Sequence, residues 1–391
     1  MKLNDLPQNF VDDLVAIRRD IHANPELAYE EVRTSKLVAE KLRSYGVDEV
    51  HTGIAKTGLV GVIRGKRSGG SIGLRADMDA LPMQEKNSFL HASNRAKVMH
   101  ACGHDGHTTM LLGAAQYLAA TRNFAGTVHL IFQPAEEGGA GGDLMVKEGL
   151  FERFDCDRIF AVHNRPDLPI GKWGTRVGPF MASADSFTIE ITGKGGHAAR
   201  PHLVCDPVVV AATVALAMQT IVSRNVSPLE CAVVGISAIE GGNLPAFAVV
   251  PDTVKMTGTV RTYDPATQDL IEARMGELVA GICDAHRAKG TLNFTRLYPP
   301  VINTAEEVEF ARLAAAEVWG EENANANYTP SMGGEDFSFM LQKRPGCYSV
   351  IGQGTGGEII PIHNTRYDFC DAIIPNGVRY FSRLAERGLP L

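Results

Sequence analysis

The chain has 391 residues, 45% of them hydrophobic and 21% charged, with a formal net charge of −7. This length exceeds one ordinary domain, so we expect two structural units, and the apolar fraction excludes a disordered chain. The negative balance supplies no basic field for phosphates, so nucleic acid is not an expected partner.

Neither a membrane span nor a secretory leader is expected. The longest apolar runs are interrupted by Gly or by charge, and the N-terminal stretch mixes acids with its apolar residues. Seven cysteines are scattered without a CxxC pair, which predicts neither a disulfide framework nor a zinc ribbon. A reduced cytoplasmic location is the fitting expectation.

The first portion of the chain alternates helix and strand signals. Residues 9–45 have helical periodicity, and Thr108–Leu118 forms a second, Ala- and Leu-rich helical stretch. Short apolar runs that predict strands lie at Leu59–Ile63, Ile72–Ala76, Val128–Phe132 and Ile159–Val162. This alternation predicts an α/β fold in which helices flank a mainly parallel mixed sheet.

From residue 184 the pattern changes. The predicted elements are Phe187–Ile191 (strand), Pro207–Val222 (helix), Ala232–Ile239 and Thr253–Thr262 (strands), Gln268–His286 (helix) and Thr291–Leu297 (strand). The order β-α-β-β-α-β is that of a ferredoxin-like α+β domain. After residue 300 the helix–strand alternation returns. We therefore expect residues 184–299 to be inserted into a discontinuous domain made of 1–183 and 300–391.

A cluster of potential metal ligands precedes the second helical stretch. His100, Cys102, His104 and His107, together with Asp105, fall within eight residues. A thiolate and an imidazole two residues apart can face one metal ion or bridge two, with glycines letting the backbone fold closely. The alternative is a polar turn whose histidines cap the helix, and the cluster alone does not decide between the two.

Further candidates follow two predicted strands. Glu136 and Glu137 come just after Val128–Phe132, and His163 ends Ile159–Val162. Functional groups gather beyond the carboxyl ends of strands in open α/β sheets, which favours one Glu as ligand and its neighbour as general base. His363 follows a Gly-rich loop and is a weak candidate by itself. There is no Walker A, GxSxG or HExxH motif.

Many separate stretches together resemble one family, the aminoacylase/carboxypeptidase-type dinuclear metallo-amidohydrolases, in the branch of hippurate hydrolases and auxin-conjugate (IAA-amino acid) hydrolases. The stretches that carry the resemblance are Arg18–His22 with Pro25–Leu27, Leu74–Pro82, His100–His107, Gln133–Gly138, His163–Asn164, Gly195–His202, Met332–Phe337, and His363 with Tyr367–Phe369. The resemblance spans nearly the whole chain, and it implies a zinc-exopeptidase-like fold for the discontinuous domain.

The resemblance also implies a site and a reaction. Two divalent ions (Zn, Mn, Co or Ni) would be held by a set of five ligands, namely Cys102, His104, Glu137, His163 and His363. Glu136 would be the general base, and Asp77 and Asp79 would orient the ligands. His197 would lie near the substrate, an N-acyl amino acid, and polarise its carbonyl. The inserted domain would close over the site and form a homodimer.

Some positions depart from the family pattern. Ala248 stands where the family has an Asn that approaches substrate, and Asn243 is the candidate to replace it. Arg165 follows His163–Asn164 where an aromatic residue is common. These changes leave the ligands and the base intact and bear on substrate choice. A metallo-dipeptidase is the nearest alternative, and a non-catalytic metal-binding or ligand-binding relative is a further one.

Overall fold

The computed structural model describes residues 2–391, which form two compact units. The first unit comprises residues 2–180, 302–330 and 336–391, and the second comprises 181–301 with 331–335. Residues 331–335, which the sequence pattern alone assigns to the first unit, thus belong to the second.

The first unit is built on an eight-stranded mixed sheet with the order β1-β2-β4-β3-β5-β16-β6-β15. Its centre is parallel, since β3 pairs in parallel with β4 and β5, and β5 with β16. The strands are β1 (Glu49–Ile54), β2 (Gly58–Arg64), β3 (Ser71–Asp77), β4 (Thr127–Gln133), β5 (Arg158–Pro169), β6 (Trp173–Gly174), β15 (Ala324–Asn325) and β16 (Gly346–Gly354). The predicted α/β class with a mainly parallel mixed sheet is confirmed.

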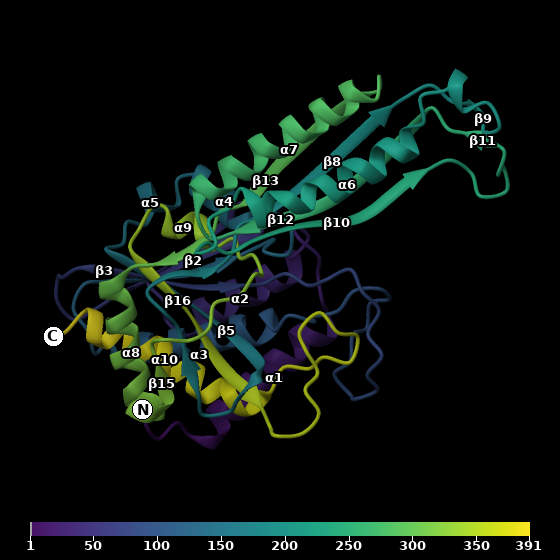
Figure 1. Ribbon diagram of the computed structural model, residues 1–391. Coiled ribbons are helices and arrows are strands. Elements are labelled where there is room, and N and C mark those ends of the chain that lie inside the picture. Colours follow the sequence, from purple (N-terminus) through teal and green to yellow (C-terminus); the bar gives the residue numbers. More distant parts are fainter. Residues whose placement is uncertain (1) are drawn as a thin grey trace. The chain divides into compact units, whose positions relative to one another are not determined.

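Helices flank this sheet (Figure 1). They are α1 (Gln8–Ala23), α2 (Val32–Ser44), α3 (His104–Thr121), α4 (Gly141–Lys147), α5 (Leu150–Arg153), α8 (Ala305–Trp319), α9 (Ser338–Leu341) and α10 (Ile374–Gly388), with 3₁₀ turns η2 (Glu321–Asn323) and η3 (Asp371–Ile373). Helix α3 packs against α1 and α10 and is buried on nearly all sides, which explains its Ala- and Leu-rich sequence.

Strand register brings the predicted site residues to one edge of the sheet. Asp77 at the end of β3 is paired with Gln133 at the end of β4, three residues before Glu136. On the other side of β3, Arg75 pairs with Ala161, so His163 lies level with Asp77. Parallel strands therefore deliver Asp77, the Glu136–Glu137 pair and His163 at the same carboxyl edge, as α/β sheets commonly do.

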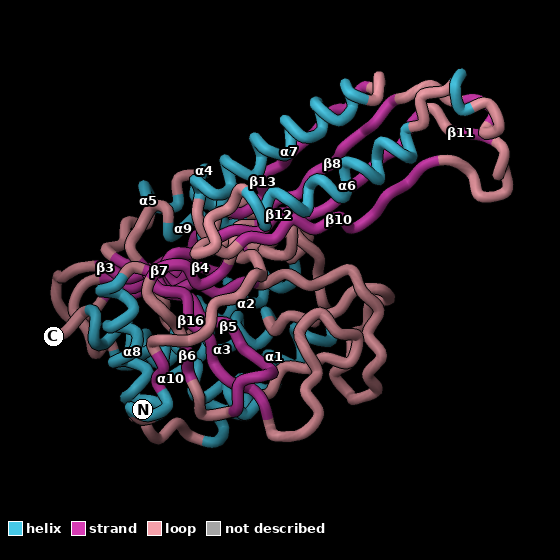
Figure 2. Tube along the Cα trace, viewed as in Figure 1, coloured by secondary structure: helices cyan, strands magenta, loops and turns pink. Residues whose placement is uncertain are grey.

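The second unit is a four-stranded antiparallel sheet, β10-β12-β8-β13, with two helices (Figure 2). Its elements are β8 (Ala184–Thr192), β9 (Gly196–His197), η1 (Pro201–Leu203), α6 (Pro207–Arg224), β10 (Ala232–Gly241), β11 (Val249–Val250), β12 (Thr253–Thr262), α7 (Pro265–Ala285) and β13 (Lys289–Tyr298). Short strands β7 (Gly178–Met181) and β14 (Val301–Asn303) pair where the chain passes between the units. The chain order β8-α6-β10-β12-α7-β13 is the predicted ferredoxin-like arrangement.

Helix α6 begins at a well-formed cap, where the Asp206 side chain accepts from Val208 N and Pro207 occupies the first turn. One face, including Val214 and Met218, packs on the sheet and on α7. Its length and composition would also suit a membrane span, but only 33% of that window is buried in the structure. The exposed face of α6 therefore carries apolar side chains that the fold of this unit does not use.

Candidate metal centre

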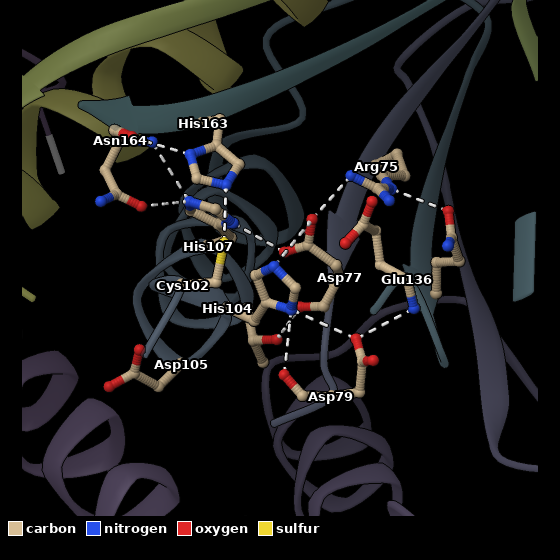
Figure 3. A network of polar contacts seen from close by, with 12 residues as sticks. Arg75, Asp77, Asp79, Cys102, His104, Asp105, His107, Glu136, His163 and Asn164 are labelled. Carbon is tan, nitrogen blue, oxygen red and sulfur yellow. Dashed lines mark hydrogen bonds and ion pairs between the residues drawn. The ribbon is translucent and has the colours of Figure 1, made fainter. Parts of the chain in front are cut away.

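The predicted ligands of the first unit converge at the carboxyl edge of its sheet. Figure 3 shows three of them, Cys102, His104 and His163, beside Glu136. Cys102, His104 and His163 each present a ligand atom, all within 4.8 Å of one another. Within the same limit, Cys102 groups with Glu137 and His363, and His104 groups with Glu136 and Glu137. The five predicted ligands and the predicted base thus form overlapping clusters joined through shared residues.

Close backbone approach at the start of α3 makes this convergence possible. Gly103 has φ +103°, and a Cβ there would lie 2.1 Å from Asn164 Oδ1. No other residue type fits that position, because the left-handed conformation and the contact both exclude a side chain. Gly103 consequently lets Cys102 and His104 flank the site, with Cys102 Sγ 3.3 Å from His163 Nε2.

The two buried imidazoles are oriented by hydrogen bonds to carbonyl oxygens. His104 Nδ1 donates to the Asp79 carbonyl oxygen at 2.9 Å, and His163 Nδ1 donates to the Asn164 carbonyl oxygen at 2.7 Å. Because a carbonyl only accepts, Nδ1 carries the hydrogen in both rings, and the lone pair of the neutral ring is on Nε2. His104 Nε2 is buried without a hydrogen-bond partner. Metal-binding histidines commonly use this arrangement, in which the nitrogen that does not bind the metal donates a hydrogen bond.

Surrounding carboxylates make the site strongly favourable for cations. Burial opposes protonation of His104, yet Asp77 and Asp79 outweigh it and raise the pKa of His104 to about 10. Burial raises the pKa of the Cys102 thiol, and the negative charges of Glu137 and Glu136 raise it further. A thiolate in this setting requires nearby positive charge, so the donor set fits divalent cations.

Asp79 also fixes the two glutamates. Its Oδ1 accepts from Glu136 N at 3.0 Å and its Oδ2 from Glu137 N at 2.9 Å. The Glu136 side chain is buried, and its Oε1 accepts from Asp336 N at 3.4 Å. One carboxylate therefore connects the backbone of the predicted base to the orientation of His104.

Asp77 lies in a second set of buried polar contacts. His107 Nδ1 donates to Asp77 Oδ1 at 2.6 Å, and Arg75 Nη1 donates to Asp77 Oδ2 at 2.7 Å. Burial acts against ionisation of Asp77, but His104, Arg75 and His107 hold its pKa well below the usual range. His107 Nε2 is 2.7 Å from Asn164 Oδ1, so both of its ring nitrogens are engaged.

No individual role was expected for Arg75 or Asn164, and His107 was expected only as one of several potential metal ligands or helix-capping histidines. Only one signal was available: His107 lies three residues after His104, on the same side of a helix. Its partners are distant in sequence, and only the folded sheet brings them together.

The other predicted residues have different surroundings. Arg165 on β5 donates to both oxygens of Asp167, at 2.9 and 2.8 Å, so its charge is already paired. His197 on β9 and Asn243 belong to the second unit and are exposed. His197 pairs with Val249 of β11, and its Nδ1 accepts from Ala199 N at 3.1 Å.

Comparison with known proteins gives the family. Residues 73–387 match the model of the peptidase family M20/M25/M40. The chain belongs to this family. It is 43% identical to the hippurate hydrolase of Campylobacter jejuni, covering 95% of this chain and 96% of that one. It is 38% identical to the N-acetyl-L-cysteine deacetylase of Bacillus subtilis, over 88% and 81% of the two chains.

Plant and structural relatives agree with this family membership. The IAA-amino acid hydrolase ILR1-like 2 of Arabidopsis thaliana is 40% identical, over 97% of this chain and 85% of the relative. The YXEP protein of Bacillus subtilis, described as a dinuclear metal-binding peptidase of the M20 family, superposes with a TM-score of 0.84 at 32% identity, covering 98% and 99% of the chains. The resemblance drawn from the motifs is confirmed, and the chain is a metal-dependent amidohydrolase.

Proposed function

We propose that this protein hydrolyses the amide bond of N-acyl amino acids, releasing a carboxylic acid and an amino acid. The observation that carries the proposal is the clustering of Glu136 with His104 and Glu137, which places a carboxylate next to the candidate metal ligands. Relatives named for hippurate, N-acetylcysteine and IAA-amino acids all act on an amide between an acyl group and an amino acid.

Two divalent ions would be held by Cys102, His104, Glu137, His163 and His363. When bound, such ions lower the pKa of water towards neutrality and polarise an amide carbonyl. Imidazole, carboxylate and thiolate donors suit Zn, Mn, Co or Ni, and availability helps to decide among them. The predicted orienting role of Asp79 is supported by its contacts with His104 and the Glu136 amide. For Asp77, support comes from its contacts with Arg75 and His107.

Glu136 takes a proton from the attacking water and passes it to the leaving nitrogen. Its backbone amide is held by Asp79 and its Oε1 accepts from the Asp336 amide, so both the backbone and the side chain of Glu136 are restrained. A restrained base loses little free energy to reorganisation during the reaction. His197 would stabilise negative charge on the carbonyl oxygen.

Substrate contacts are assigned to Asn243 and Arg165. Arg165 sits two residues after His163 on β5, and its ion pair with Asp167 leaves little net charge. We therefore assign Arg165 to the wall of the substrate site, in contact with uncharged parts of the substrate. Asn243 would supply the amide that Ala248 lacks.

The second unit would form a homodimer. Helix α6 exposes Val208, Val209 and Leu216, and β10 is an edge strand with an exposed Ile239. Unpaired strand edges and exposed apolar patches favour association with another copy. Light scattering after size exclusion should give twice the chain mass, and Leu216→Asp should give the mass of one chain.

A reducing compartment, the cytoplasm, is the proposed location. All seven cysteines are free in the part of the chain that the structure describes. Such a set is typical of proteins kept in reduced surroundings.

The reaction is tested by measuring amine release from N-acetyl, N-benzoyl and longer N-acyl amino acids and from dipeptides. Metal-reconstituted protein should act on the acyl compounds, and Glu136→Gln should reduce the rate by at least about 100-fold. Preference for dipeptides would replace the acylase assignment with a dipeptidase. Equal rates with and without Glu136 would contradict the proposed base.

A further inference from the structure

The loop that carries Glu136 and Glu137 is hydrogen-bonded to a segment about a hundred residues earlier in the chain. The Glu31 side chain, with 0% exposure, accepts from Ala135 N at 2.9 Å and from Thr57 Oγ1 at 2.6 Å. Tyr29 donates its hydroxyl hydrogen to the Gly139 carbonyl oxygen at 2.7 Å. The segment before α2 therefore contacts both ends of residues 135–139.

Three consecutive amides of this loop are held by two buried carboxylates. Glu31 binds the Ala135 amide, and Asp79 binds the amides of Glu136 and Glu137. Ala135 has φ +55°, a left-handed conformation that is unfavourable for a non-glycine residue. The Glu31 hydrogen bond holds this conformation where the chain turns from β4 into the site.

Packing alone does not require a charge at this position. Burial raises the pKa of Glu31, and the nearby Asp79 raises it further against the lowering effect of Thr57. Burying a carboxylate close to other carboxylates costs free energy unless hydrogen bonds satisfy its oxygens. Here one of those bonds holds Ala135, the residue that immediately precedes the proposed base, and the other comes from Thr57.

We propose that Glu31 is a positioning residue for the reaction, holding the Ala135 amide so that Glu136 and Glu137 face the metal site. This inference rests on the proposed function for its kinetic consequence. Its consequence for metal affinity does not depend on the substrate, since Glu137 is itself a proposed ligand.

The test compares Glu31→Met, which removes the acceptor, with Glu31→Gln, which retains an acceptor for Ala135 N. Glu30→Met, at the exposed neighbouring position, is the matched control. In Glu31→Met we expect kcat to fall roughly 100-fold, as misplacement of a reacting group by about 1 Å can cause. We expect KM to change less than about threefold. Glu31→Gln should recover most of kcat, and Glu30→Met should match the wild type.

Metal affinity, measured by competition with a chromogenic chelator, supplies a readout apart from activity. It should weaken in Glu31→Met and stay unchanged in Glu30→Met. A Glu31→Met protein with a lower urea midpoint but wild-type kcat and metal affinity would overturn the inference. If the wild-type protein were inactive on every substrate, the proposed function would be wrong. Weaker metal binding in Glu31→Met would still support the role of Glu31 in that case.

Discussion

At the scale of single residues, the candidate centre depends on the hydrogen bonds that orient each proposed ligand. His104 and His163 each donate a hydrogen bond from Nδ1 to a carbonyl oxygen, so Nε2 is the ring nitrogen that can bind a metal ion. Asp79 combines this role with the anchoring of two successive amides, so it supports a proposed ligand and the proposed base at once. Removing it should disturb both functions together.

We predict that Asp79→Ala weakens metal binding by about 10- to 100-fold, the usual loss when a residue that orients a ligand is removed. Chelator competition on purified protein measures this change. The control is Asp269→Ala, which removes an exposed carboxylate of α7 that pairs with Arg296. Wild-type affinity in Asp79→Ala would show that the His104 orientation does not depend on this carboxylate.

His22 gives a pH-dependent prediction. It is buried between Asp105 and Glu85, at 2.8 and 3.3 Å. Burial opposes its charge, but the two carboxylates prevail and raise the pKa of His22 from 6.5 to about 9. Because the folded pKa is the higher one, the stabilisation is fully present below pH 6.5 and is lost as the pH rises to about 9.

His22→Gln should therefore lower the free energy of unfolding more at pH 6 than at pH 9, by roughly 3 kcal/mol. Urea titrations at several pH values measure this difference. The exposed His202→Gln serves as control and should run parallel to the wild type. Parallel curves for His22→Gln as well would contradict the assigned ion pairs.

At the scale of elements, helix α3 must approach its neighbours closely to present Cys102 and His104. A Cβ at Gly106 would lie 2.2 Å from Phe369 Cε2, although the residue is in the first turn of a helix, where Ala is normally a better helix former than Gly. We predict that Gly106→Ala destabilises the protein by about 1–3 kcal/mol. At Gly281 in α7 nothing lies within 4 Å of the added Cβ, so Gly281→Ala should be neutral or stabilising. Urea unfolding of the two variants measures the difference. Equal urea midpoints for Gly106→Ala and Gly281→Ala would contradict this packing.

The same elements show how far a sequence predicts such a site. Periodicity and strand ends led to the Glu136–Glu137 pair and to His163, because parallel strands end at one edge. His363 and the full ligand set came from the family resemblance, since no local pattern distinguishes His363. The contact between Glu31 and Ala135 and the pairing of Arg165 with Asp167 depend on side-chain geometry in the folded chain. Neither of these two contacts can be predicted from the composition or from the spacing of residues.

At the scale of the whole molecule, metal binding and folding are expected to be linked, because the ligands come from segments spread between Cys102 and His363. An ion at 100 times its dissociation constant contributes about 2.7 kcal/mol to the folded state. Chelation should lower the melting temperature by several degrees, and re-addition of metal should restore it. His163→Ala should lose most of this response while Glu136→Gln keeps it. A melting temperature indifferent to chelator would contradict the ligand set.

The central claim is that a two-ion site and Glu136 act together on an amide. The most direct measurement is the rate of N-acyl amino acid hydrolysis as Mn²⁺ is added stepwise to metal-free protein. We predict that the rate rises until about two equivalents are bound, and that Glu136→Gln binds the same amount without comparable hydrolysis. Hydrolysis that is complete without metal, or undiminished in Glu136→Gln, would contradict the account.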